Sequence, residues 1–342
     1  MMTESRVDFL PILRVLALFC AAALVMATGA SGHAQSLLPS GTGVSANVVP
    51  LGSAISADDP PMPVFRSRTD EVNVIFTVTD KHNKFVKDLK QAQFTILDNN
   101  MPPRQVTNFE SETDLPLRVG LLIDASNSIK DRFSFEQQAS IEFLRQIIRP
   151  RTDKAFILAF DEVTDLTQDF TSDMNQLTHG VNVIRPGGGT ALWDAVFTSC
   201  RDKLMNERAE GTNGTVRKAI ILVSDGDDNQ SRMTRQEAYD MAQRSGVIIY
   251  AISTNLSNIY DNGDRNLKML AEATGGRAFF PSKIHDLTGA FKSIQEELRS
   301  QYSVSYKPDQ FDGSGKYRPI QIVAENKKFH VRAKKGYFVP RQ

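Results

Sequence analysis

The sequence contains little cysteine, histidine or tryptophan, and its charges balance. Among its 342 residues are two cysteines, five histidines and one tryptophan. Only Cys200 lies beyond the N-terminal segment, and one thiol cannot form an internal disulfide. The histidines are scattered without the paired spacing of a zinc site. With 40 basic and 40 acidic side chains, the chain lacks the broad basic character of nucleic-acid-binding proteins, so we expect no nucleic-acid partner.

The sequence also lacks an apolar run as long as a membrane-spanning helix requires. The run near the N-terminus covers residues 15–28, fewer than the roughly 20 residues needed. It follows Arg6 and Arg14 and precedes the small residues Gly32 and Ala34, a pattern typical of a signal peptide. We expect residues 1–34 to be cleaved near Ala34, leaving no stable membrane span; the alternative is a retained anchor. Export without a disulfide favours a bacterial periplasmic or extracellular protein.

Two segments with different patterns follow the expected signal peptide. Residues 35–63 are rich in Ser, Gly, Ala and Pro, which predicts a flexible leader. In residues 64–112, apolar and polar residues alternate, which predicts short strands near residues 72–78, 94–97 and 106–109. Asp98-Asn99-Asn100 predicts a turn after the second strand.

Residues 113–301 have short apolar runs that alternate with helical repeats. Four runs have the composition of buried strands: residues 117–123, 155–160, 219–223 and 247–252. Helical patterns follow Ser134, which fits a capping box with the residues after it, and recur near residues 191–206, 234–245 and 286–300. The alternation predicts an α/β fold with a doubly wound, mostly parallel sheet and helices on both faces.

Period-two alternation returns in residues 302–342. In an α/β unit, the first strand begins and the last helix ends at the same edge of the sheet. The strands of residues 64–112 and 302–342 therefore emerge side by side, and we expect them to form one small β-sandwich. Two independent β-appendages are the alternative.

Oxygen-bearing side chains gather where the predicted strands end. Asp124, Ser126 and Ser128 follow the first buried strand, and Asp225 follows another strand in a Ser-Asp-Gly context. Thr190 comes after three glycines, in a loop before a helix. The carboxyl ends of parallel strands form the ligand-binding edge of an open sheet. Three loops at that edge can build a metal site from oxygen atoms alone.

This pattern resembles the von Willebrand factor type A domain, also called the integrin I domain, over about residues 117–301. All five residues match positions of that family's metal ion-dependent adhesion site, abbreviated MIDAS. The Gly-Gly-Gly-Thr-Ala-Leu-Trp-Asp-Ala stretch and Gly336-Tyr337-Phe338 resemble more narrowly the VWFA-related proteins described from Acidobacteria.

The resemblance implies a role for each of the five residues. Ser126, Ser128 and Thr190 would bind Mg²⁺, or Mn²⁺ or Ca²⁺, directly, while Asp124 and Asp225 would act largely through water. Three hydroxyls and two waters leave one position of an octahedron open. A carboxylate offered by a protein partner would fill that position.

Other motifs give weaker signals. The glycine-rich loop lacks the ending of a P-loop, and no Gly-x-Ser-x-Gly elbow of a serine hydrolase occurs. Residues 260–264 predict a surface turn, with calcium binding as the alternative. Asp227 and Asp228 also fit a solvated turn, whereas Trp193 and Cys200 lie on an apolar helical stripe and predict core positions.

These observations favour an exported, metal-dependent protein-binding module of the adhesion type. One alternative is a structural component of an envelope assembly that has no metal-dependent ligand. A metal-assisted hydrolase is a further alternative. Because no candidate general base accompanies the site, we do not expect an enzyme.

Overall fold

The computed structural model describes residues 71–111, 115–208, 216–255, 259–283, 285–310 and 312–340. The signal peptide and the leader expected for residues 1–34 and 35–63 lie outside these ranges. All described residues lie within one compact unit. Among them, no helix combines the length and the apolar character that crossing a membrane requires.

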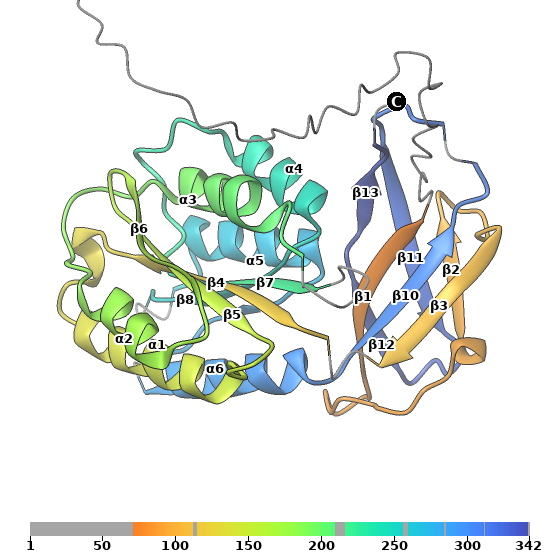
Figure 1. Cartoon of the computed structure of the whole chain (residues 1–342), viewed down its shortest axis with the longest axis horizontal. Coiled ribbons are helices and arrows are strands. Elements are labelled where there is room, and N and C mark those ends of the chain that lie inside the picture. Colours follow the sequence, from red (N-terminus) through yellow and green to blue (C-terminus); the bar gives the residue numbers. More distant parts are fainter. Residues whose placement is uncertain are drawn as a thin grey trace, which may run out of the picture. The chain divides into compact units, whose positions relative to one another are not determined.

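A six-stranded sheet forms the centre of the α/β part (Figure 1), with strand order β6-β5-β4-β7-β8-β9. Four neighbouring pairs are parallel and only β6 runs antiparallel, against β5. Every residue of β4 is buried, as expected for a strand with both faces covered. The predicted α/β fold with a mostly parallel sheet is confirmed. The strands are β4 Leu117–Asp124, β5 Lys154–Phe160, β6 Thr164–Thr171, β7 Arg217–Ser224, β8 Ile248–Ser253 and β9 Ala278–Phe279.

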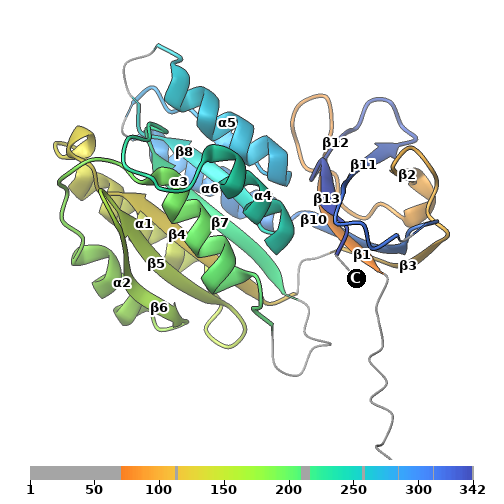
Figure 2. The same ribbon diagram turned by 90° about the horizontal axis from the view of Figure 1, so that it is seen from above.

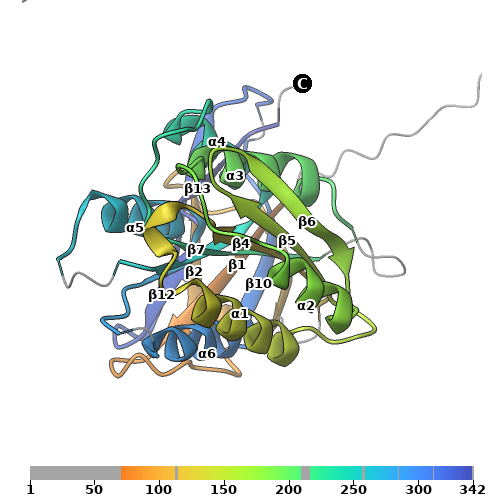
Figure 3. The same cartoon turned by 90° about the vertical axis from the view of Figure 1, so that its left-hand side faces the viewer.

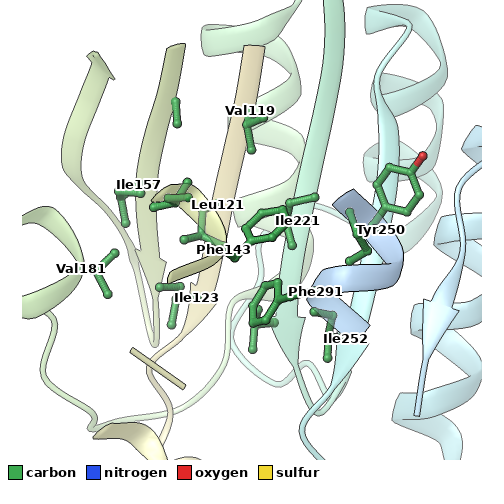
Figure 4. Close-up of a cluster of buried hydrophobic side chains, with 14 of the residues drawn as sticks. Val119, Leu121, Ile123, Phe143, Ile157, Val181, Ile221, Tyr250, Ile252 and Phe291 are labelled. Carbon is green, nitrogen blue, oxygen red and sulfur yellow. The ribbon is translucent and has the colours of Figure 1, made fainter. Parts of the chain in front are cut away.

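Helices cover both faces of this sheet (Figures 2 and 3). One face packs against α1 (Phe133–Ile147), α2 (Met174–Asn182) and α6 (Asp286–Leu298). The other packs against α3 (Leu192–Thr198), α4 (Arg235–Ser245) and α5 (Asn262–Thr274). Figure 4 shows Leu121 and Ile221 of the sheet beside Phe143 of α1 and Phe291 of α6. The rings of these two phenylalanines lie 4.8 Å apart, so the two helices share one apolar core.

The start of the first helix differs from the sequence prediction. Helix α1 begins at Phe133 and its N-cap residue is Arg132, which makes no side-chain capping hydrogen bond. Ser134 is exposed and lies inside the helix, so the predicted capping box is wrong. Glu136 is buried instead, and Nε of Arg132 donates to its Oε1 at 3.2 Å.

Several elements carry weak signals in the sequence. The edge strand β6 reads Thr-Asp-Leu-Thr-Gln-Asp-Phe-Thr and lacks the apolar run of a central strand. Helix α2 and helix α5 were likewise not predicted. The helical pattern of residues 191–206 corresponds to α3 followed by a π-helical segment, Ser199–Leu204.

The flanking strands form two antiparallel sheets with orders β12-β1-β10-β3 and β13-β11-β2. In each sheet a strand from before the α/β part pairs with one from after it: Val74 of β1 lies opposite Val304 of β10, and Ile96 of β2 lies opposite Ile322 of β11. The apolar faces of both sheets contribute to one buried cluster, which gives a small β-sandwich. Its strands are β1 Val72–Thr79, β2 Phe94–Asp98, β3 Gln105–Ser111, β10 Gln301–Lys307, β11 Tyr317–Ala324, β12 His330–Ala333 and β13 Gly336–Phe338. A single turn of 3-10 helix, Gln91–Gln93, precedes β2.

A charged residue lies at the centre of this sandwich. Asp98, at the end of β2, is 1% exposed. Its Oδ2 accepts hydrogen bonds from the hydroxyls of Tyr306 and Tyr337, both at 3.0 Å. Arg318 pairs with its Oδ1 at 2.6 Å. The predicted turn is present at Asn99 and Asn100, which both have positive φ, but Asp98 itself is a buried hub that links strands of both sheets.

Polar residues also link the sandwich strands β10 and β12 to the α/β part. Glu297 is almost fully buried near the end of α6 and forms an ion pair with Arg332 of β12. Nε of Arg332 also donates to the carbonyl oxygen of Gly275, at 3.2 Å. The side-chain amide of Gln301 donates to the hydroxyl of Tyr250 at 3.0 Å, and burial raises the pKa of this tyrosine well above its ordinary value.

Candidate metal centre

The first loop of the candidate site begins at the end of β4. Asp124 is fully buried there, and its two carboxylate oxygens have different partners. Oδ1 accepts the backbone N–H of Ser126 at 2.9 Å, and Oδ2 accepts the hydroxyl of Ser224 at 2.7 Å. Asp124 therefore fixes the conformation of its own loop and joins it to the end of β7. A 3-10 turn, Asn127–Ile129, then carries the chain toward α1.

The glycine-rich loop before Thr190 lies against the first loop. The backbone N–H of Gly187 donates to the carbonyl of Ala125 at 2.6 Å, and that of Asn127 donates to the carbonyl of Gly188 at 3.3 Å. Gly188 has a φ of +74°, a conformation that side chains other than glycine rarely adopt. The glycines therefore permit the close backbone contact that brings Thr190 to the site.

Thr190 is held by the third loop through its backbone. Its N–H donates to Oδ1 of Asn229 at 2.9 Å, and its carbonyl accepts the N–H groups of Asn229 and Gln230, both at 3.0 Å. The hydroxyl of Thr190 takes no part in these backbone hydrogen bonds. The second loop is thus hydrogen-bonded to both of the others.

Direct side-chain contacts join the first and third loops. The hydroxyl oxygens of Ser126 and Ser128 lie 3.0 Å apart, and the hydroxyl of Ser128 donates to Oδ2 of Asp225 at 2.7 Å. Oδ1 of Asp225 accepts the N–H of Asp227 at 3.2 Å. Ser126, Ser128 and Asp225 therefore form one continuous series of hydrogen-bonded side chains. Asp124 joins this series because it accepts the backbone N–H of Ser126.

A sharp turn allows the third loop to adopt this position. Gly226 has a φ of +84°, and a Cβ atom there would lie 2.2 Å from the carbonyl oxygen of Gly263. No side chain fits such a distance. The Ser-Asp-Gly context that marks Asp225 in the sequence thus has a steric origin.

The electrostatic environment of the site is negative. Burial raises the pKa of Asp124 to about 6, and the charge of Asp225 adds to that rise, while hydrogen bonds from Ser224 and Ser126 oppose it. Burial also raises the pKa of Asp227, with contributions from the charges of Asp225 and Asp261. Excess negative charge around buried carboxylates favours a nearby cation.

The chemistry of the side chains fits a hard divalent cation. The five residues offer only oxygen atoms, the ligands that Mg²⁺ prefers. In the described part of the chain, no group of three or more His, Cys, Asp and Glu side chains could hold a metal ion. Among the five residues, Ser126, Ser128 and Thr190 offer hydroxyl oxygens, and Asp124 and Asp225 offer carboxylate oxygens.

Two residues of the site were not predicted from the sequence. Ser224 donates to Asp124 and accepts the N–H of Gly226 at 3.0 Å, so its hydroxyl connects the first and third loops. Asn229 holds Thr190. Ser224 could have been predicted from the sequence, because it directly precedes Asp225. Asn229 could not, because it acts through a contact between distant loops that no local pattern reveals.

The structure assigns local roles to the other candidates. Asp261 is the N-cap of α5 and forms a capping box with Asp264, which agrees with a turn at residues 260–264. Oδ1 of Asp228 accepts the hydroxyl of Ser231 and, at 3.4 Å, the N–H of Trp193. Trp193 and Cys200 are buried in the core beside α3, as predicted.

Several solved structures are similar to part of this chain. Proximal thread matrix protein 1 from the mussel byssus, with a zinc-occupied MIDAS motif, is similar at a TM-score of 0.47 and 14% identity, over 59% of this chain and 50% of that chain. The PilB minor pilin from Streptococcus sanguinis is similar at 0.42 and 13%, over 59% and 63%. The vWF domain of the type V pili tip protein Mfa5 from Porphyromonas gingivalis is similar at 0.43 and 14%, over 53% and 94%. The chain thus spans about half the length of the mussel protein.

No curated protein matches the sequence. The family model of the von Willebrand factor type A domain, by contrast, matches residues 119–296. This range contains the whole candidate site and more than half of the chain. The chain therefore belongs to the von Willebrand factor type A domain family.

Proposed function

We propose that the chain is an exported protein-binding module of the adhesion type, whose binding depends on a divalent cation. Ser126, Ser128 and Thr190 would hold the cation through their hydroxyls, and Asp124 and Asp225 would balance its charge. When bound, the cation supplies a Lewis-acidic position that accepts a carboxylate from a partner protein. Mg²⁺ is the cation we expect, with Mn²⁺ and Ca²⁺ as alternatives.

The observation that carries this proposal is the series of hydrogen-bonded side chains that runs from Ser126 through Ser128 to Asp225. The hydroxyls of Ser126 and Ser128 in the first loop lie 3.0 Å apart, and that of Ser128 donates at 2.7 Å to the carboxylate of Asp225 in the third loop. The second loop is hydrogen-bonded to both of these loops. Neutral hydroxyls withdraw little charge from a bound cation, so the cation keeps its attraction for a further oxygen. This arrangement suits binding of an acidic group, and we propose no catalytic residue.

The proposal extends to the organisation of the whole chain. Residues 113–301 would form the von Willebrand A domain, and residues 64–112 and 302–342 would form the sandwich module. The signal peptide would direct the protein to the periplasm or to the extracellular space. Membership of this domain family supports interaction with a protein partner.

A magnesium titration followed by thermal unfolding tests the metal site. Binding to the native state raises the free energy of unfolding by about 2.7 kcal/mol at a hundredfold excess over the dissociation constant. We expect this increase in the wild type and its loss in Ser128→Ala. The matched control is Ser134→Ala, which removes the same group from an exposed position on α1.

A second substitution guards against a local folding effect. Thr190→Val removes the hydroxyl but keeps the shape of a side chain whose loop is fixed by backbone hydrogen bonds. We expect it to abolish the magnesium response as well. A magnesium response of equal size in Ser128→Ala, Thr190→Val and the wild type would reject the assigned site.

A further inference from the structure

A cavity of about 310 Å³ lies where the α/β part meets the sandwich. Its wall includes the ends of α4 and of the π-helical segment, together with the face of β1 that points away from the sandwich core. Val216 and Lys218 line it at the start of β7, and Ile248 at the start of β8. The cavity therefore lies at the sheet edge opposite the candidate metal centre, and its volume suits a small organic molecule.

Contacts between folded elements hold the wall of this cavity in place. The guanidinium of Arg244, near the end of α4, lies 4.1 Å from the centre of the Phe338 ring in β13. Thr274 lines the cavity at the end of α5, and its hydroxyl oxygen accepts the backbone N–H of Ile249 at 2.9 Å. The cavity is thus formed before any ligand arrives, which lowers the cost of binding.

Three basic residues line the cavity: Lys218, Lys334 and Arg208. Nζ of Lys334 donates to the backbone carbonyl of Asn73 at 2.8 Å, and Nζ of Lys218 donates to that of Met205 at 2.9 Å. Asn73 and Met205 also line the cavity, so both ammonium groups lie at its wall. An ammonium group has three N–H donors, and each of these bonds uses one of them.

Neither ammonium group forms an ion pair with a carboxylate in the described part of the chain. Glu207 is the one acidic residue among the described residues that line the cavity, and its Oε1 lies 2.9 Å from Nε of Arg118. Burial lowers the pKa of Lys334 to about 8, so this side chain is still mostly charged at neutral pH. The wall thus carries an excess of positive charge, which favours an anion.

The cavity also has an apolar side. Val216, Val247 and Ile248 line it and are 8%, 2% and 7% exposed, and the half-buried Ile75 of β1 lies among the same lining residues. Sites for small molecules combine apolar surface of this kind with a few polar groups that fix the orientation of the ligand. A ligand that fits both sides carries an anionic group on an apolar body.

We propose that this cavity binds a small organic oxyanion, a carboxylate or a phosphate on an apolar body, whose charged group contacts the ammonium groups of Lys218 and Lys334. The two ammonium groups select the charge of the ligand, and the apolar side selects its body. The site needs no metal ion, so the inference stands or falls independently of the proposed function.

Isothermal titration of the full chain tests the site, without metal, at neutral pH and at constant ionic strength. The probes are benzoate, phenyl phosphate and benzamide; benzoate and benzamide have nearly the same shape, but only benzoate is charged. We expect at least one of the two anions to bind about tenfold or more tightly than benzamide, because hydrogen bonds between charged groups are stronger than those to a neutral amide. The anion that binds more tightly identifies the charged group that the site prefers.

Two substitutions assign the binding to this cavity. Lys334→Met keeps the length of the side chain and removes its charge, and we expect it to weaken binding of the preferred anion by about tenfold or more. Lys218→Met should do the same, so a folding defect in one variant, seen by circular dichroism, leaves the other to decide. Lys335→Met is the matched control, because the side chain of Lys335 is 65% exposed and its Nζ lies 3.9 Å from Glu272.

Three results would overturn the inference. One is a wild type that binds neither benzoate nor phenyl phosphate. Another is equal affinity for benzamide and both anions, which would show an apolar cavity without selection for charge. The third is anion binding that is unchanged in both folded variants, Lys334→Met and Lys218→Met, which would place the bound anion elsewhere on the protein.

Discussion

Replacing Asp98 removes the one carboxylate on which the buried polar network of the sandwich converges. In Asp98→Ala, the guanidinium of Arg318, which is 12% exposed, loses its ion pair, and the hydroxyls of Tyr306 and Tyr337 lose their acceptor. Breaking a buried pair from one side typically costs about 3–5 kcal/mol. We expect a loss of stability in that range.

Smaller substitutions divide this effect into parts. Tyr306→Phe removes one hydrogen bond to the carboxylate and leaves that of Tyr337, so we expect a loss of about 1.5–3 kcal/mol, the contribution typical of a hydrogen bond to a charged group. Tyr317→Phe is the matched control because Tyr317 is partly exposed. A surface change of this kind stays within about 0.5 kcal/mol.

Urea unfolding followed by two signals provides the assay. Far-ultraviolet circular dichroism reports on all regular structure, whereas the fluorescence of Trp193, the one tryptophan of the chain, reports on the α/β core. A shift in both signals shows that the sandwich and the α/β part unfold together, and a shift in circular dichroism alone shows that they unfold separately. A loss below about 1 kcal/mol in Asp98→Ala would refute the assignment of Asp98 as the hub.

Three further outcomes follow from the structure. The pKa of Glu136 is raised to about 8 in the folded state, so the folded protein holds this proton more tightly than the unfolded chain does. The stability that comes from the protonated carboxyl is fully present below about pH 4.5 and is lost as the pH rises through about 8. Thermal unfolding without metal should show this decline, and Glu136→Gln should reduce it. Gly226→Ala would force a Cβ atom to within 2.2 Å of the carbonyl of Gly263, so chemical denaturation should show a loss of at least about 1 kcal/mol and calorimetry a weaker Mg²⁺ response. Burial raises the pKa of Cys200 to about 12, so in a Cys20→Ser variant a thiol reagent should react only after unfolding.

The parts of the fold that the sequence predicted are those with a strong local pattern. The apolar run before Asp124 identified β4, since a strand covered on both faces needs apolar residues at every position. The order of strands and helices then placed Asp124, Thr190 and Asp225 at one edge. The three loops required no tertiary information beyond the rule that parallel strands end together. The choice of five residues within these loops came from the resemblance to the metal site of the von Willebrand factor type A family.

The parts that the sequence did not predict depend on contacts between distant segments. Asp98 belongs to a run that favours a turn, and only the pairing of β2 with β11 and the approach of Tyr306 make it a buried hub. Ser134 fits a capping box by spacing, but Glu136 is buried and paired with Arg132 instead. In each case a polar side chain was assigned by its neighbours in the sequence, whereas its environment is set by segments far away in the chain.

The same topology separates the proposed binding edge of the sheet from the edge where the chain enters and leaves the α/β part. Parallel strands bring Asp124 and Asp225 to one edge, while the chain leaves the other edge through α6 and continues directly into β10 at Gln301. At that second edge Arg217, at the start of β7, donates to the carbonyl of Leu298 at the end of α6. Structural polar contacts therefore stabilise the end where the chain enters and leaves. On the proposed function, the loops at the first edge, which do not carry the chain into or out of the α/β part, would serve a cation and a partner.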